Sequence, residues 1–231
     1  MGVMQTVTAV AHRGDPYRFR ENTIDSLRSA LDRGADAVEI DVRLTRDGVP
    51  VLLHDGTLRR LWEHDRPLSA LSAEEVRGLT AGGVPTLAEA LAATGDSRVM
   101  VDLCGRVDRR TADRVVDVIR QSGAGERVYY CAGADAMLAV RGADPAAEIA
   151  LTWTTLAPPR PALLDAVRPR WLNYRFSLVS RDLAARVHHD GCLLSVWTPD
   201  TRRSMSRLLD LGVDSITTNR VDVLHALRNG A

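Results

Sequence analysis

The hydrophobic positions of this chain follow two periods that alternate along its length. Short runs rich in Val, Ile and Leu are typical of buried strands, and segments whose apolar residues recur every three or four positions are typical of amphipathic helices. The strands are expected at residues 7–11, 37–44, 98–104, 127–131, 148–153, 170–174, 193–198 and 213–219. The helices are expected at 22–34, 86–95, 112–123, 180–191, 201–212 and 221–228. Such alternation predicts a parallel sheet.

Eight strand–helix units within 231 residues predict an α/β fold of the (β/α)₈ TIM-barrel type. An open, doubly wound sheet is the alternative, but the first strand–helix turn lacks the G-x-G-x-x-G pattern of its dinucleotide-binding form. No linker interrupts the pattern, so we expect residues 1–231 to form a single TIM-barrel domain. Residues 55–85 are the one long insertion, and we expect them to form a short cap after the second strand.

Composition narrows the classes of partner. The formal net charge is zero, which does not favour general binding to nucleic acid or to an anionic membrane. The three cysteines are far apart and suggest no disulfide framework or zinc site. The N-terminus does not resemble a signal peptide and no apolar run is long enough to span a membrane, so a cytoplasmic protein is expected. No feature indicates the oligomeric state.

Two acids interrupt the second apolar run. On a strand, residues two apart share a face, so Glu39 and Asp41 point the same way. Asp47-Gly48 follows as a two-residue hairpin signal. A turn centred there would place Asp41 opposite His54 on the returning strand, with Cβ atoms about 4.5–5.5 Å apart.

Two neighbouring carboxylates repel each other, and burial increases that repulsion. A divalent cation removes the difficulty, and oxygen ligands favour Mg²⁺, Ca²⁺ or Mn²⁺ over Zn²⁺. The alternative is that Glu39 and Asp41 face solvent and pair with Arg43 or Arg46. The central place of the strand and the histidine that follows favour the metal site.

Two other strands end in residues of the same chemistry. His12 and Arg13 follow the first strand, where barrel enzymes carry their chemistry. Arg is a bidentate partner for phosphate oxygens, and two histidines at one site can act as general base and general acid. On the third strand, Asp102 offers a third oxygen ligand.

Together these residues resemble the glycerophosphodiester phosphodiesterase family. The matching segments are AHRG (11–14), ENT (21–23) with Ser26, GADAVEIDVRLTRDGVPVLLHD (34–55), VPTL (84–87), SVWTPD (195–200) and LGVDSITTNR (211–220). The resemblance implies a TIM barrel that cleaves small glycerophosphodiesters to glycerol 3-phosphate and an alcohol with one divalent metal ion. It also implies roles for individual residues: His12 and His54 as the acid–base pair, Arg13 as a phosphate ligand, Glu39 and Asp41 as metal ligands, and Trp197 as part of the glycerol pocket.

The chain departs from the family on its third strand. The family usually has Glu-x-Lys there, whereas this chain has Asp102 and Cys104. Asp102 can still bind a metal, but the positive charge of the lysine is lost. This change and the short cap leave a second hypothesis, a specialised lyase or phosphatase-like enzyme acting on another phosphate ester. A third, a non-catalytic barrel that binds a glycerophosphoryl ligand, fits less well with the retained histidines and acids.

Overall fold

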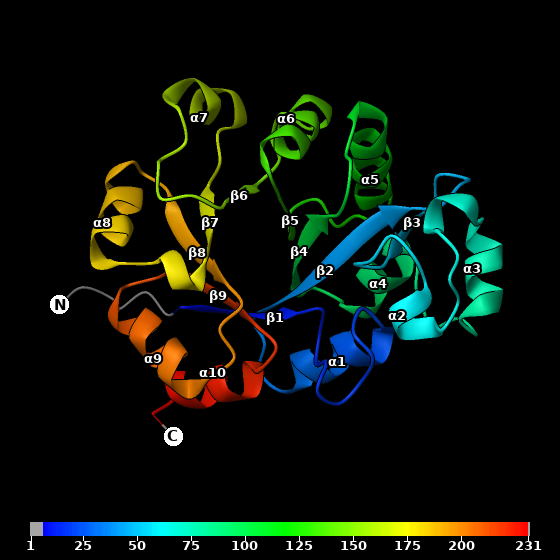
Figure 1. The fold of residues 1–231 in the computed structure, drawn as a ribbon, viewed down its shortest axis with the longest axis horizontal. Helices are drawn as coiled ribbons and strands as arrows, with labels where there is room; N and C mark the ends of the chain where they lie inside the picture. The colour runs from blue at the N-terminus through cyan, green and yellow to red at the C-terminus, as the bar shows by residue number, and fades with distance from the viewer. Residues whose placement is uncertain (1–6, 231) are drawn as a thin grey trace.

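A computed structural model describes residues 7–230. Within this range, eight parallel strands form a closed barrel, because β1 pairs with both β2 and β9 (Figure 1). The fold prediction is therefore confirmed. The barrel strands are β1 (Thr8–His12), β2 (Ala37–Leu44), β4 (Arg98–Leu103), β5 (Val128–Ala132), β6 (Ile149–Trp153), β7 (Trp171–Arg175), β8 (Leu193–Trp197) and β9 (Ser215–Thr218).

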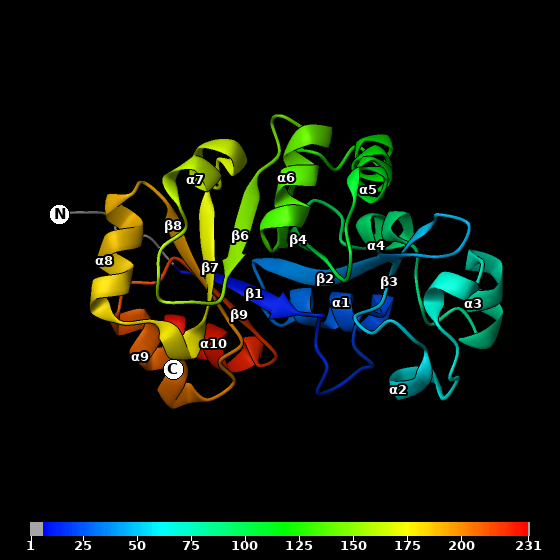
Figure 2. The same cartoon turned by 45° about the horizontal axis from the view of Figure 1, so that its top comes forward.

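Helices surround the barrel (Figure 2). They are α1 (Ile24–Asp32), α4 (Leu87–Ala93), α5 (Arg109–Gln121), α6 (Ala134–Ala143), α7 (Pro161–Val167), α8 (Arg181–His189), α9 (Arg202–Asp210) and α10 (Val221–Arg228). The outward side chains of the strands, such as Val38 and Ile40, are buried in the main hydrophobic core with the inner faces of these helices. Burial of this apolar layer stabilises the barrel, at roughly 25 cal/mol per Å² removed from water.

The sequence pattern did not predict α6 and α7. Helix α6 is rich in Ala and apolar around much of its surface, so it lacks a clear polar face. Helix α7 has seven residues and begins with Pro161, and Pro is favoured in the first turn of a helix but also marks turns and loops.

The segment after β2 forms an appendage beside the barrel. Strand β3 (Pro50–Leu52) returns antiparallel to β2, and α2 (Arg59–Trp62), the 3₁₀ helix η1 (Leu68–Ala70) and α3 (Ala73–Leu79) follow. Helices α2 and α3 lie at the end of β2, on the side of β3 and α4 (Figure 1). They bury a small hydrophobic cluster of their own, which includes Leu58, Leu71 and Val76.

The predicted hairpin exists, but its register was wrong by one residue. Val42 lies opposite Leu52, and the Leu53 N–H donates to the Asp41 carbonyl, so Leu53 rather than His54 is the partner of Asp41. The reason is the turn: Thr45 pairs with Val49, which leaves a three-residue loop closed by Gly48 at φ +77°. A glycine in the left-handed region is typical of three-residue hairpin loops.

Among the helices of residues 7–230, none combines the length and the apolar character needed to cross a membrane. The expectation about the N-terminal leader concerns in part residues 1–6, which lie outside the described residues.

Candidate active site

The polar side chains of β2 point into the barrel. Glu39 and Asp41 are 3% and 1% exposed, and Val38 and Ile40 lie on the opposite, outward side of the strand. The interpretation that the two acids face solvent is therefore wrong. Arg43, one of the suggested partners of these acids, instead donates from Nε to the His54 carbonyl at 2.7 Å.

Three carboxylates meet inside the barrel. Asp41 is directly opposite Asp102 on the neighbouring strand, and one oxygen from each of Glu39, Asp41 and Asp102 lies within 4.8 Å of the others. Burial, reinforced by the neighbouring carboxylates, raises the pKa of Glu39 well above its usual value and that of Asp102 to about 7. The donors are all hard oxygens that repel one another, so this set fits Mg²⁺, Ca²⁺ or Mn²⁺.

The loop after β1 holds two of these carboxylates. The Arg13 N–H donates to Glu39 Oε2 at 2.9 Å, and Asn22 Nδ2 donates to Asp41 Oδ2 at 2.7 Å. The Arg13 guanidinium, predicted to bind phosphate, forms ion pairs at 2.9 Å with Asp41 and with Glu21. It thus lies at the cavity and is already paired with two carboxylates.

Gly14 permits the sharp turn in this loop. Its φ is +88°, and a Cβ added there would lie 2.4 Å from the Oγ of Ser26. That hydroxyl donates to the Arg13 carbonyl at 3.0 Å and accepts from the Asp15 N–H at 2.8 Å. Because its positive φ favours glycine and the close approach leaves no room for a Cβ, Gly14 lets the loop turn back after Arg13.

His12 is oriented by a chain of two hydrogen bonds to residues in the loops after β9 and β8. Its Nδ1 lies 2.8 Å from Asn219 Oδ1, and Asn219 Nδ2 donates to Asp200 at 2.7 Å. Since Asp200 fixes the amide with its oxygen toward the ring, Nδ1 of His12 carries the proton and Nε2 remains as the acceptor in the neutral ring. Burial and the charge of Arg13 lower the pKa of His12 below its usual value.

His54 has a charged partner instead. Its Nδ1 lies 2.7 Å from Asp55 Oδ1, and Asp55 also accepts from Arg60 Nε at 2.6 Å. The bonds from Arg60 and His54 lower the pKa of Asp55 to about 2. The two rings therefore differ in their partners: Nδ1 of His12 meets a neutral amide, whereas Nδ1 of His54 meets a carboxylate that an arginine also holds.

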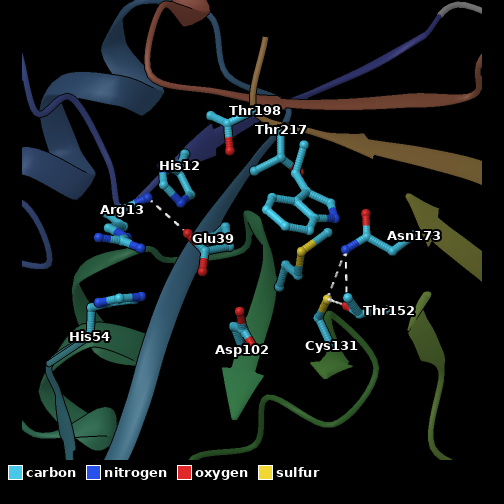
Figure 3. Close-up of a pocket in the computed structure, with 12 residues that line it drawn as sticks. His12, Arg13, Glu39, His54, Asp102, Cys131, Thr152, Asn173, Thr198 and Thr217 are labelled. Atoms are coloured by element: carbon cyan, nitrogen blue, oxygen red, sulfur yellow. Dashed lines mark hydrogen bonds between the residues drawn. The ribbon is translucent and has the colours of Figure 1, made fainter. Parts of the chain in front are cut away.

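A cavity of about 310 Å³ joins these groups. Figure 3 shows His12, Arg13 and His54 on one side of Glu39, and Cys131, Thr152 and Asn173 on the other. Asn173 Nδ2 lies 3.2 Å from both Cys131 Sγ and Thr152 Oγ1, so this second wall is polar but neutral. Seven predicted residues surround or underlie the cavity: His12, Arg13, Glu39, His54, Asp102 and Trp197 line it, and Asp41 lies directly beside Glu39 and Asp102.

Four supporting residues escaped the sequence prediction. Asn22 holds Asp41, and Asp55 holds His54. Asp200 holds Asn219, which in turn holds His12. All four belong to segments that carry the family resemblance, and each is a polar residue beyond the end of a strand. That position was the available signal, although the sequence alone does not pair them with their partners.

We expect the variant Asp102→Asn to remove a pH-dependent loss of stability from the metal-free protein. The raised pKa means that folded Asp102 keeps a proton that the unfolded chain releases between about pH 4 and pH 7. Its contribution to the free energy of unfolding is therefore present at low pH and is lost as pH rises toward 7. In EDTA, the melting temperature of the variant relative to the unmodified protein should be higher at about pH 8 than at about pH 5. A difference that does not change with pH would contradict the raised pKa of Asp102.

Comparison of the sequence with known proteins identifies the family of this chain. The model of the glycerophosphoryl diester phosphodiesterase family matches residues 12–223. A glycerophosphodiester phosphodiesterase from Caldanaerobacter subterraneus is 29% identical, with 93% of this chain and 95% of that protein covered.

Solved structures agree with the fold. A glycerophosphodiester phosphodiesterase from Thermotoga maritima has a TM-score of 0.83 at 21% identity, over 96% of this chain and 98% of that one. A phosphodiesterase from Oleispira antarctica, solved with the product sn-glycerol-3-phosphate, has a TM-score of 0.85 at 22% identity, over 97% of both chains. The match of the family model to most of the chain shows that this protein belongs to the glycerophosphoryl diester phosphodiesterase family.

Proposed function

We propose that residues 1–231 form one catalytic domain that hydrolyses small glycerophosphodiesters to glycerol 3-phosphate and an alcohol. As a member of its family the chain is a phosphodiester hydrolase. The observation that carries the finer proposal is the convergence of two buried carboxylates, one half-buried carboxylate and two differently supported histidines around one cavity.

One divalent cation, Mg²⁺, Ca²⁺ or Mn²⁺, would be held by Glu39, Asp41 and Asp102. Their repulsion in its absence and their all-oxygen donor set support this assignment. When bound, the cation supplies Lewis-acid stabilisation of the charge that develops on the phosphate oxygens.

The two histidines move the protons. His12 Nε2, left as an acceptor by the Asn219 contact, takes the proton of the nucleophile, which is either water or the glycerol hydroxyl next to the phosphate. His54, supported by Asp55, gives a proton to the oxygen of the departing alcohol. In the water route, one P–O bond forms as the other breaks, and both histidines return to their starting states through solvent. In the hydroxyl route, a cyclic phosphate forms first and is opened by water in a second step.

Arg13 and Trp197 complete the substrate site. Both line the cavity, and Arg13 places a permanent positive charge beside the carboxylates. A guanidinium there can bind a phosphate oxygen while it still balances Asp41. The Trp197 ring offers apolar surface to the carbon side of a glycerol unit.

A product screen tests this function. The purified protein is incubated with Mg²⁺, Ca²⁺ or Mn²⁺ and glycerophosphodiesters that differ in their alcohol, and the products are identified by phosphorus NMR. Glycerol 3-phosphate plus the free alcohol is the expected result, and a transient cyclic phosphate would identify the hydroxyl route. A cyclic phosphate as the final product would favour the lyase hypothesis, and no turnover of any diester would contradict the proposal.

A further inference from the structure

A second group of potential metal ligands overlaps the carboxylate cluster. One ligand atom from each of Asp41, His54 and Cys104 lies within 4.8 Å of the others. The Cys104 thiol donates to Asp41 Oδ1 at 3.1 Å. The carboxylate cluster offers only oxygen, whereas this second group offers oxygen, nitrogen and sulfur.

Asp41 and His54 are already oriented by hydrogen bonds to neighbouring side chains. His54 Nδ1 lies 2.7 Å from the Asp55 carboxylate, and Asp41 Oδ2 accepts from Asn22 Nδ2 at 2.7 Å. Asp41 Oδ1 is thereby turned toward the thiol. A histidine that donates one ring N–H to a carboxylate is the usual arrangement behind a metal-bound histidine. The geometry therefore includes outer support as well as a donor set.

The chemistry of this group selects a different metal. Mg²⁺ and Ca²⁺ prefer oxygen ligands, whereas Zn²⁺ and Co²⁺ accept imidazole and thiolate together with a carboxylate. We propose that Asp41, His54 and Cys104 form a second cation site, selective for Zn²⁺-like metals, whose occupation inhibits the enzyme.

Occupation would release protons to solvent, because the Cys104 thiol must lose its hydrogen to bind as thiolate and the His54 nitrogen that binds the cation must carry no proton. The thiolate and the Asp41 carboxylate then supply two negative charges to the cation, beside the Arg13 guanidinium that also pairs with Asp41. The lysine that the family usually carries at position 104 would exclude a cation from this place, so the proposal depends on the cysteine of this chain.

Inhibition follows from two shared residues. Binding at this site engages His54, which is then no longer available as a proton donor, and it engages Asp41, which belongs to the oxygen site. The inhibitory effect therefore rests on the proposed phosphodiesterase function. Metal binding itself does not, so the two can be tested separately.

Titration with Co²⁺ tests the site without any substrate. The unmodified protein should develop the near-ultraviolet charge-transfer absorption of a cobalt–thiolate bond, and Zn²⁺ should abolish it. Cys104→Ser should lose the absorption, whereas Cys192→Ser, which changes a buried cysteine outside both ligand groups, should keep it. Absence of the absorption from the unmodified protein, or its persistence in Cys104→Ser, would overturn the site.

Inhibition is then measured by adding Zn²⁺ at saturating Mg²⁺, with each variant compared with its own rate without Zn²⁺. Cys104→Ser should raise the half-inhibitory Zn²⁺ concentration by at least about tenfold, since losing even an outer-shell partner costs about 10–100-fold in metal affinity. Equal inhibition of Cys104→Ser and the unmodified protein, or activation by Zn²⁺, would overturn the inhibitory role. If no diester is hydrolysed, the proposed function fails while the cobalt absorption still decides the site.

A measurement on the unmodified protein avoids any dependence on the folding of variants. Alkylation of Cys104, followed by mass spectrometry of its peptide, should be slowed by Zn²⁺ and not by the same concentration of Mg²⁺. Equal alkylation rates with both metals would count against thiolate coordination.

Discussion

His12→Ala and His54→Ala should each lower kcat by about 10²–10⁴-fold, the usual effect of one acid–base group. Each ring has a different partner, so the two variants should also change the pH dependence in different ways. His12 must be neutral to accept a proton, and its pKa lies below the usual value, so activity should rise with pH below neutrality. That rise should disappear in His12→Ala. His54→Ala should keep this rise, because it leaves His12 and its partner Asn219 in place.

The double variant and a surface control complete this test. The combined loss in His12→Ala/His54→Ala should be smaller than the product of the single losses, because both residues serve one proton-transfer scheme. His189→Ala, on the exposed side of α8, should keep the original kcat. If His189→Ala were as damaging as His12→Ala, or if His12→Ala kept the rise of activity with pH, the assigned roles would be wrong.

The hairpin after β2 shows why one part of the site was found through an incorrect register. The sequence predicted that His54 faces Asp41 on the sheet, but the three-residue loop shifts the pairing, and β3 ends at Leu52. His54 therefore lies beyond the ladder. It is anchored by the bond from Arg43 to its carbonyl and by the contact of its ring with Asp55. Alternation along a strand predicts which side chains share a face, but it does not predict side-chain contacts made after the strand ends.

The barrel itself follows from the sequence because its causes are local. Strands with apolar outward faces recur between amphipathic helices, and each barrel strand pairs in parallel with its neighbours. The contact of His12 with Asn219 joins residues 207 positions apart, and Asn22 reaches Asp41 from a left-handed conformation with φ +57°. Neither hydrophobic periodicity nor strand alternation encodes such pairings, so the supports of the site required the structure.

Loss of one carboxylate from the oxygen cluster should have the other large effect. Glu39→Gln keeps the shape of the side chain, and its amide oxygen can still accept the Arg13 N–H bond that Glu39 accepts at 2.9 Å. It removes one negative charge from the proposed metal ligands, so the fold should be retained while the divalent cation binds more weakly. We expect activity at limiting Mg²⁺ to fall by at least about 10³-fold, which corresponds to roughly 4 kcal/mol of transition-state stabilisation.

Thermal unfolding measures the same loss without substrate. For the unmodified protein, a cation at 100 times its dissociation constant should add about 2.7 kcal/mol to the free energy of unfolding. In a chain of this length that corresponds to a rise of roughly 5–11 °C in melting temperature. EDTA should reverse the rise, and Glu39→Gln should show little of it. Glu126→Gln, the same substitution on an exposed residue outside the cavity, should retain both the activity and the full rise. The substitution leaves the neighbouring ligands Asp41 and Asp102 in place, so any change reports on Glu39 alone. A Glu39→Gln protein with normal activity and a normal rise in melting temperature would therefore show that the metal is not held by this carboxylate.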